Sequence, residues 1–548
     1  MSLVKPFAAG SVLSLTTPAA ADAPVTPVEL CLVKLIVGPG NPGPADAPST
    51  SSGIGIEIWL PTLAHWNKRY QAIGNGGFAG GPEVTSLSAI GALRPGASPL
   101  ALAGAGFVTS INDGGHPGIG GNFALNPDGS FNAASFADFA ERASHEMAVK
   151  TKALINAFYG EAAQFSYWNG CSEGGREGLM EVQKYPADFD GVLAGAPAVD
   201  FDRLGIADLW PQVVMQVDLG GPMAVGKLVA VTAAANAACS SGLTGQPDGY
   251  ISDPAACHYD PTKDAALLCS SAGGTNAAAS CFTLAEAAAV NKIWYGPTST
   301  GTVPDPALDN GSGALGALAP GQLWFGVERG SRLADHPIWE GLAGPDPFLF
   351  ATDMTALALL DPRFAEPIFT NATANGERKW QSIDYTGSSS LASVMAASRE
   401  RMGALIATDD PDISAFAARG GKLLLWHGTA DSLIPTFGSV RYYEALAQSA
   451  GGYEQARNFA RFYLAPGIDH CFSAGVSGTN PPVPGGVDVG TGLMDVLQTW
   501  IEHGTAPEQI AARSEAGTAP SRTRPWCPYP SKLKYVGGNV DSGSFTCE

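Results

Sequence analysis

Residues 165–195 read FSYWNGCSEGGREGLMEVQKYPADFDGVLAG, and the order of elements in this segment indicates the class of fold. The apolar run 165–168 predicts a short strand, 176–184 is compatible with a helix, and 191–194 predicts a second strand. A strand, a helix and a strand in succession are typical of a parallel sheet that is covered by helices on both faces. The segment therefore predicts an α/β fold.

A pentapeptide between the first strand and the helix, Gly170-Cys171-Ser172-Glu173-Gly174, fits the pattern G-x-S-x-G. In α/β-hydrolases this pattern places a serine on a strained turn, where its hydroxyl is presented above the sheet. Such pentapeptides also arise by chance in a chain with 68 glycines. The strand before the motif and the helix after it favour the functional interpretation, so Ser172 is the candidate nucleophile.

A serine nucleophile needs a base and a carboxylate that orients the base, and in this fold class the chain order is serine, acid, histidine. Asp431 lies in a turn directly after the apolar strand expected at 421–428. His470 lies in a loop after the next apolar run. Asp431 and His470 are therefore the candidate acid and base. His427 is the rival histidine, but it precedes the acid and is expected to be a structural residue.

Two of these candidates have a cysteine as their chain neighbour. Cys171 directly precedes Ser172, and Cys471 directly follows His470. If the serine and the histidine meet in space, the two cysteines are close enough to form a disulfide between nucleophile and base. The alternatives are two unrelated buried cysteines, or Cys171 as a thiol nucleophile, which an oxidising environment would disfavour.

Attack of a serine on a carbonyl carbon also needs N–H donors for the negatively charged oxygen of the tetrahedral intermediate. The residue after the nucleophile, Glu173, is expected to supply one of them. A second is expected from the glycine-rich loop 74–81, GNGGFAGG, which follows the strand expected at 70–73. The loop lacks the G-K-[ST] ending of a phosphate-binding loop. A plain turn is the remaining alternative.

The alternation of predicted strands and helices stops and then resumes later in the chain, which predicts a discontinuous catalytic domain. Residues 25–200 and 406–548 carry alternating strand and helix patterns. Residues 201–405 carry alanine-rich helical patches, a Gly/Pro/Ser/Thr-rich stretch and scattered aromatic residues, so they are expected to form an inserted lid domain. Residues 1–24 are expected to be a leader or a disordered segment.

Composition excludes several classes of function. The 548-residue chain is 45% hydrophobic, which is enough for a large core, and its net charge of −20 offers no basic face for nucleic acid. No apolar run is long enough for a transmembrane anchor. Nine cysteines without CxxC pairs, several at loop-like spacing, indicate an exported, secreted or periplasmic protein with disulfides. Beyond the pair beside the candidate site, the expected pairs are Cys239 with Cys257, Cys269 with Cys281, and Cys527 with Cys547.

Seven segments together resemble the tannase and feruloyl esterase family. They are GNGGFAGG (74–81), INDGGHPG (111–118), WNGCSEGGREGLMEVQKYPADFDGVLAGAPA (168–198), DISAFAARGGKLLLWHGTADSLIP (412–435), APGIDHC (465–471), WIEHGTAPEQI (500–510) and RPWCPYPSKLKYVGGNVDSGSFTC (524–547). The paired Cys-Ser and His-Cys arrangement is more specific than the serine motif. The resemblance implies an α/β-hydrolase core with a large lid and hydrolysis of esters of aromatic or phenolic acids. It also implies a triad of Ser172, Asp431 and His470, and oxyanion donors on Glu173 and on Gly76 or Gly77.

Two departures from the family pattern concern a metal and a cysteine. Family lids carry a calcium loop after a cysteine, but residues 239–254 retain only the ending with Asp248 and Asp253. Calcium prefers six to eight oxygen ligands, so no cofactor is expected, and these two aspartates are weak calcium candidates. Cys31 has no evident partner and is expected to be a free, buried thiol.

The sequence therefore predicts a serine esterase that forms an acyl-enzyme with a small aromatic ester. Lid aromatic residues such as Trp324, Phe325 and Trp339 are expected to form a slot for the aryl ring, or else the core of the lid itself. The alternatives are another exported α/β-hydrolase, such as a thioesterase or a peptidase, and a catalytically silent binding protein on the same fold. Lid arginines that would bind a free carboxylate, among them Arg329, Arg332 and Arg363, are not distinguishable from surface residues.

Overall fold

A mixed β-sheet forms the centre of the computed structural model, which describes residues 2–15, 19, 23–78, 80–81, 98–336, 341–471, 479–486, 488–515 and 520–548. In this described part the main sheet has nine strands in the order β1-β2-β3-β5-β4-β6-β7-β8-β9. The strands from β5 to β9 along this order are parallel, whereas β1, β2 and β3 pair antiparallel at one side. Their bounds are β1 Leu3–Phe7, β2 Leu30–Val37, β3 Ile54–Pro61, β4 Arg69–Ile73, β5 Val108–Asn112, β6 Phe165–Cys171, β7 Gly191–Gly195, β8 Lys422–Gly428 and β9 Ala460–Ala465.

The sheet is apolar on both faces, as a sheet covered by helices on both sides must be. Alternate residues of β8 belong to different cores: Leu423 and Leu425 pack in the larger core, and Leu424 and Trp426 pack in the smaller one. The period of two follows from strand geometry, in which successive side chains point to opposite faces. Both faces of the predicted sheet are therefore filled by packed side chains.

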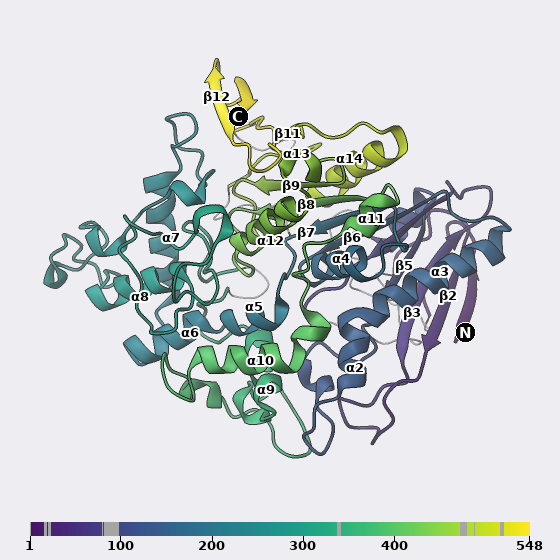
Figure 1. Ribbon diagram of the computed structural model, residues 1–548, viewed down its shortest axis with the longest axis horizontal. Helices are drawn as coiled ribbons and strands as arrows, with labels where there is room; N and C mark the ends of the chain where they lie inside the picture. Colours follow the sequence, from purple (N-terminus) through teal and green to yellow (C-terminus); the bar gives the residue numbers. More distant parts are fainter. Residues whose placement is uncertain are drawn as a thin grey trace.

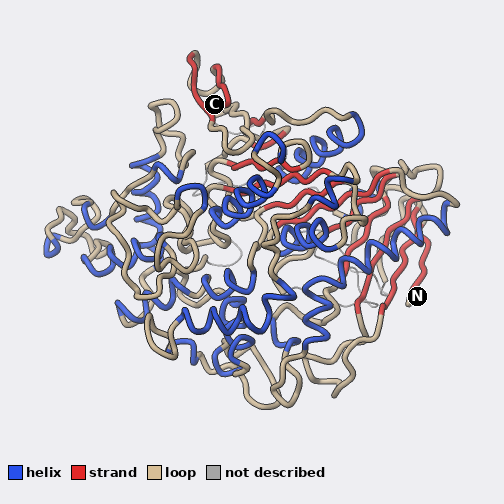
Figure 2. Tube along the Cα trace, viewed as in Figure 1, coloured by secondary structure: helices blue, strands red, loops and turns tan. Residues whose placement is uncertain are grey.

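Helices cover the two faces of the sheet (Figures 1 and 2). The larger core receives side chains from α3 (Ala143–Tyr159), α4 (Glu173–Lys184) and α12 (Thr436–Ser449), whereas α14 (Val489–His503) packs into the smaller core. A π-helical turn at Asp138–Arg142 separates α2 (Ala133–Ala137) from α3. The predicted α/β class is confirmed.

The chain between β7 and β8 lies largely beside the sheet rather than in it (Figure 1). Its helices are α5 Phe201–Ala207, α6 Trp210–Val214, α7 Val225–Cys239, α8 Leu284–Tyr295, α9 Leu349–Leu359, α10 Leu391–Ile406 and α11 Ser414–Ala418. Helix α10 is tied to α5 by a hydrogen bond from Ser398 Oγ to the Asp202 carbonyl oxygen at 2.6 Å. Residues 201–405, for which a lid domain is expected, lie within this segment; the lid and its boundaries stay a prediction.

The beginning of the chain differs from the expected leader or disordered segment. Residues Leu3–Phe7 form β1, which pairs antiparallel with β2, so Pro6 lies opposite Cys31. Residues 16–18 and 20–22 lie outside the described residues. The strand was not predicted because a proline and a lysine interrupt its apolar pattern; proline is tolerated there because β1 is an edge strand.

Four disulfides are present in the described chain. They join Cys171 to Cys471, Cys239 to Cys257, Cys269 to Cys281, and Cys527 to Cys547. Cys31 is a free, half-buried thiol, and burial raises its pKa. The C-terminal pair closes a hairpin of β12 (Leu533–Gly537) and β13 (Ser544–Cys547), seen at the top of Figure 1. Within the described residues, no helix has both the length and the apolar character needed to cross a bilayer.

Candidate active site

Ser172 lies at the carboxyl end of β6, on the turn that leads into α4. Its backbone has φ 66° and ψ −124°, in a region that a non-glycine residue rarely adopts. The turn is held because the Ser172 N–H donates to the Gly195 carbonyl oxygen at 3.0 Å. A side chain at Gly170 would meet the carbonyl oxygen of Gly174 at 2.2 Å, so the glycines of the motif allow this close approach. The strained turn leaves Ser172 partly exposed.

Asp431 and His470 meet beyond the carboxyl ends of β8 and β9. His470 Nδ1 lies 2.8 Å from Asp431 Oδ2 and 3.1 Å from Oδ1. Because a carboxylate can only accept, Nδ1 carries the hydrogen, and the lone pair of the neutral ring is on Nε2. The pair has the geometry of a base oriented by a carboxylate.

The Asp431 carboxylate is fully buried but strongly stabilised as an anion. Oδ1 accepts from the backbone N–H groups of Leu433 and Ile434, both at 2.9 Å. Burial alone would raise the pKa of Asp431, but its electrostatic interactions and hydrogen bonds with His470 and His427 lower it well below the ordinary value. Asp431 is therefore ionised at neutral pH.

His427 is fully buried and contacts the same carboxylate from the other side. Its Nε2 lies 3.1 Å from the Ile434 carbonyl oxygen and 3.2 Å from Asp431 Oδ2, and its Nδ1 lies 2.8 Å from Ser439 Oγ. Both neighbours of Nε2 are acceptors, so Nε2 donates. Every polar atom of the ring is used within the protein, which agrees with the structural role expected for His427.

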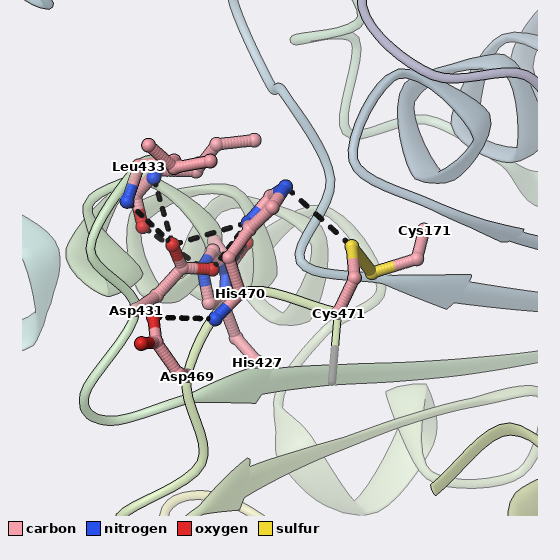
Figure 3. The surroundings of a disulfide bond; sticks show 9 residues. Cys171, His427, Asp431, Leu433, Asp469, His470 and Cys471 are labelled. Carbon is pink, nitrogen blue, oxygen red and sulfur yellow. Dashed lines mark hydrogen bonds and ion pairs between the residues drawn. A yellow bond between two sulfur atoms is a disulfide. The ribbon is translucent and has the colours of Figure 1, made fainter. Parts of the chain in front are cut away.

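A disulfide brings the serine and the histidine together, as Figure 3 shows for its surroundings. The Cys171–Cys471 bond has a Cα–Cα distance of 5.9 Å and links residues 300 apart in sequence. His470 Nε2 lies 3.5 Å from Cys471 Sγ. No hydrogen bond joins Ser172 Oγ to this Nε2 among the described side chains. Contacts of this type often tighten only when substrate binds.

The glycine-rich loop lies against the first turn of α4. The Gly174 N–H donates to the Asn75 carbonyl oxygen at 3.0 Å. Glu177, one turn further along α4, accepts from the Asn75 backbone N–H at 2.8 Å and from Asn75 Nδ2 at 3.0 Å. These bonds fix the backbone immediately before Gly76 and Gly77, beside the N–H groups that begin the helix.

One lid aromatic residue contacts the glycine-rich loop directly. A side chain at Gly77, whose φ is +55°, would meet the Phe350 ring at 2.2 Å. Phe350 of α9 packs edge-on against Phe78 and Phe348, with ring centroids 5.5 and 4.9 Å apart. Lid aromatic side chains are thus placed against the loop that is expected to bind the oxyanion.

The other lid residues singled out in the sequence have mixed environments. Trp324 and Phe325 are buried and pack against one another, and Phe325 also packs against Phe437 of α12, with ring centroids 6.1 Å apart. Trp339 lies outside the described residues. Arg329 is buried and donates to backbone carbonyl oxygens, and Arg363 is an exposed partner of Asp361.

The calcium candidates pair with cationic side chains instead. Asp248 Oδ1 lies 3.1 Å from Arg524 Nη2 and 3.5 Å from Arg522 Nε, and Asp253 Oδ2 lies 2.6 Å from Lys532 Nζ. Because C-terminal cations neutralise both carboxylates, these residues do not fit a calcium site. Among the described residues, no group of three or more His, Cys, Asp or Glu side chains is arranged for a metal ion.

One site residue was missed by sequence reasoning. Asp469 is buried beside His470, and its Oδ1 accepts from the His470 backbone N–H at 2.7 Å. Its Oδ2 lies 3.3 Å from Arg332 Nε, which separates this arginine from the ordinary surface arginines. The only indication in the sequence was that Asp469 directly precedes His470, and this did not show which groups the Asp469 carboxylate contacts.

Comparisons with known proteins agree over almost the whole chain. The sequence model of a family described as tannase and feruloyl esterase matches residues 44–547. A probable feruloyl esterase of Arthroderma benhamiae is 32% identical over 540 residues, which cover 97% of this chain and 88% of the relative. The mono(2-hydroxyethyl) terephthalate hydrolase of Piscinibacter sakaiensis is 29% identical over 539 residues, covering 90% of this chain and 81% of the relative.

Solved structures show the same fold. Feruloyl esterase B from Aspergillus oryzae aligns with a TM-score of 0.74 at 25% identity and covers 100% of this chain and 96% of its own. A tannin acyl hydrolase from Aspergillus niger aligns with a TM-score of 0.72 at 21% identity, covering 100% of this chain and 90% of its own. The expected α/β-hydrolase core is therefore confirmed.

Proposed function

The chain belongs to the tannase and feruloyl esterase family and is a carboxylic-ester hydrolase; on this premise we propose that Ser172, Asp431 and His470 are its catalytic triad. The observation that carries the proposal is the convergence of three loops at one edge of the sheet. A serine on a strained turn, a carboxylate-oriented imidazole and the disulfide between their neighbours lie together there.

The first half of the reaction forms an acyl-enzyme. Ser172 Oγ attacks the ester carbonyl carbon while His470 Nε2 takes its proton, and Asp431 stabilises the imidazolium that results. The oxyanion accepts from the N–H of Glu173 and from the N–H of Gly76 or Gly77. When the tetrahedral intermediate collapses, the C–O bond to the alcohol breaks, and the imidazolium gives its proton to the departing oxygen.

The second half releases the acid. Water attacks the acyl carbon and His470 Nε2 takes its proton. The bond between Ser172 Oγ and the acyl carbon then breaks, which releases the acid, and Ser172 Oγ regains its hydrogen from His470 Nε2. Every proton taken up by the imidazole is returned, so the free enzyme is regenerated.

The acyl group is an aromatic or phenolic acid, of the feruloyl, galloyl or terephthalate type. Two relatives are named as a feruloyl esterase and a terephthalate-ester hydrolase. The contact of Phe350 with Gly77 supports this class, because it places an aryl surface beside the position of the ester carbonyl. The disulfides further support secretion or export to a periplasm.

Hydrolysis of methyl ferulate, methyl gallate and a terephthalate monoester, each compared with an alkyl ester of similar size, tests the proposal. We expect turnover of at least one aromatic ester to exceed that of its alkyl control, and Ser172→Ala to abolish it with an unchanged unfolding midpoint. Retained turnover in Ser172→Ala would exclude the triad. Preference for the alkyl esters, or for thioesters or peptides, would exclude the substrate class.

A further inference from the structure

A buried carboxylate beside the proposed base takes no part in the steps above. Asp469 is only 4% exposed and lies between the turn that carries Asp431 and the backbone of His470 (Figure 3). Its Oδ1 accepts three hydrogen bonds: from Ser432 N–H at 3.1 Å, from Ser432 Oγ–H at 2.7 Å and from His470 N–H at 2.7 Å. Ser432 directly follows Asp431, so one oxygen atom joins the neighbour of the acid to the base residue.

The second oxygen of the same carboxylate faces the lid. Oδ2 lies 3.3 Å from Arg332 Nε, and Arg332 is held in turn by a bond from Nη1 to the Asp335 carbonyl oxygen at 3.2 Å. His336, also buried, interacts electrostatically with Asp469. A buried carboxylate requires a counter-charge, and the guanidinium of Arg332 supplies it from the lid. Asp469 therefore contacts three parts of the chain.

Asp469 and the proposed acid, Asp431, bind different groups of His470. His470 uses its ring Nδ1 for Asp431 and its backbone N–H for Asp469. Asp469 therefore fixes where the His470 backbone lies, whereas Asp431 fixes the orientation and protonation of the ring. Burial and the negative charge of Asp431 also raise the pKa of Asp469, whereas the pKa of Asp431 is lowered. The two carboxylates thus differ in both partner and environment.

We infer that Asp469 is a positioning residue of this esterase. Its Oδ1 holds the Asp431 turn and the His470 backbone in one arrangement, and its Oδ2 joins that arrangement to the lid through Arg332. The inference rests on the roles proposed for Asp431 and His470. A displacement of about 1 Å in a catalytic group costs roughly 100-fold in rate. Because Asp469 is buried beneath the base loop, its loss is expected to change kcat rather than KM.

Three substitutions separate the contacts. Asp469→Ala removes all of them, whereas Asp469→Asn keeps an oxygen that accepts from Ser432 and His470 but loses the charge that pairs with Arg332. Arg332→Gln removes the lid partner and leaves the Oδ1 junction intact. The matched control is Asp188→Ala: Asp188 is another buried aspartate, bonded to a histidine at 2.6 Å, but it lies before β7 at the opposite edge of the sheet.

We expect Asp469→Ala to lower kcat on an aromatic ester by about 10- to 100-fold, with KM within about twofold of the wild type. Asp469→Asn and Arg332→Gln are expected to stay within about fivefold of wild-type kcat, the cost of one hydrogen bond. Asp188→Ala is expected to lower the unfolding midpoint but not kcat. If Asp469→Ala does not fold, Ser432→Ala, which removes only the 2.7 Å bond, is expected to lower kcat about fivefold.

Several results would overturn the inference. These are an unchanged kcat in Asp469→Ala or in Ser432→Ala, an Asp469→Asn variant as slow as Asp469→Ala, or an Arg332→Gln variant as slow as Asp469→Ala. If Asp188→Ala lowered kcat as much as Asp469→Ala does, the effect of Asp469 would be one of general stability and not of positioning. Activity that persists in Ser172→Ala would instead refute the proposed triad, so the two failures are distinguishable.

Discussion

At the scale of single residues, the geometry of the proposed oxyanion site depends on side chains that do not touch the ester. Glu177 accepts two hydrogen bonds from Asn75, and the Asn75 side chain also donates to Asn112 Oδ1 at 2.8 Å. A buried carboxylate with several donors holds a rigid loop, because any movement would leave a charge without a partner. Gly76 and Gly77 follow immediately, so their N–H groups are positioned by this network.

Replacing Glu177 with Ala is expected to lower kcat by about 10- to 100-fold, because oxyanion donors that are out of place stabilise the transition state less. Steady-state kinetics on an aromatic ester measures the effect, with KM changing little. The matched control is Glu181→Ala, a buried glutamate one turn further along α4 that has no hydrogen bond to the loop. Equal kcat in Glu177→Ala and the wild type would contradict the assigned network.

The buried carboxyl group of Asp353 is expected to make the free energy of unfolding depend on pH. Asp353 of α9 is buried and accepts from the Gly121 N–H at 2.8 Å. Burial raises its pKa to about 7, although the Gly121 bond lowers it. The unfolded chain has an Asp pKa of about 4, so the folded protein binds this proton more tightly. Its contribution to the free energy of unfolding is therefore complete below pH about 4 and is lost as the pH rises through about 7.

Asp353→Asn removes this titration and keeps an oxygen acceptor for Gly121. The difference in unfolding free energy, variant minus wild type, is expected to increase by roughly 3–4 kcal/mol as the pH rises from 4 to 8. Urea unfolding of both proteins at pH 4.5, 6 and 8 measures the difference. A stability difference that is constant over this range would show that Asp353 does not titrate as described.

At the scale of elements, the loops of the proposed triad are held by disulfides and hydrogen bonds to distant segments. The Cys171–Cys471 disulfide links the ends of β6 and β9 across 300 residues. The loop closed by Cys239 and Cys257 also reaches the site, because Thr429 Oγ1 donates to the Ile251 carbonyl oxygen at 3.2 Å. The lid loop therefore supports the same turn that carries the acid.

Removing the first link by a double substitution, Cys171→Ala with Cys471→Ala, is expected to lower both stability and kcat. The chain-entropy model gives about 6 kcal/mol for so long a loop, and separation of nucleophile from base is expected to cost tenfold or more in kcat. Thermal unfolding and ester kinetics measure the two effects. The control is Cys527→Ala with Cys547→Ala. It removes the disulfide that closes the C-terminal hairpin, far from the site, and should leave kcat unchanged. Wild-type kcat in the first variant would contradict the link's role in catalysis.

The loop closed by Cys239 and Cys257 is also held by ion pairs of Asp248 and Asp253, from which we predict that cations of the chain take the place of a metal ion. Arg524→Gln would leave Asp248 paired with Arg522 alone, and the loss of the hydrogen bond to a charged partner is expected to cost about 1.5–3 kcal/mol. Lys532→Gln, the control, breaks an exposed pair and is expected to cost less than about 1 kcal/mol. Thermal unfolding measures both, and adding calcium or a chelator should not move the wild-type midpoint. A clear rise of the midpoint with calcium would show that these carboxylates bind the ion.

The sequence predicted the elements whose patterns are local. The strand and helix around Ser172, the strand before Asp431 and the histidine after the next strand follow from apolar runs and chain order, which depend on near neighbours. The edge strand β1 was missed because its proline and lysine hide the apolar pattern. The bonds of Asp469 and Glu177 could not be predicted, because they join loops whose approach is set by the packing of the whole sheet.

At the scale of the whole molecule, the proposed site is built from separated parts of the chain. The parallel strands β4, β6, β8 and β9 end at the same edge of the sheet, and each contributes one loop to the site. The lid segment adds Phe350 beside the glycine-rich loop and Arg332 beside Asp469. The central claim is that this edge of the sheet holds one activated serine, Ser172.

Covalent labelling with a fluorophosphonate, followed by digestion and peptide mass spectrometry, tests that claim most directly, because only an activated serine reacts rapidly. The account predicts one adduct per molecule, on the peptide that contains Ser172, with loss of esterase activity in proportion to labelling. Ser172→Ala should remain unlabelled, and His470→Ala should label far more slowly. An adduct on a different serine, or full esterase activity in protein labelled at Ser172, would contradict the account.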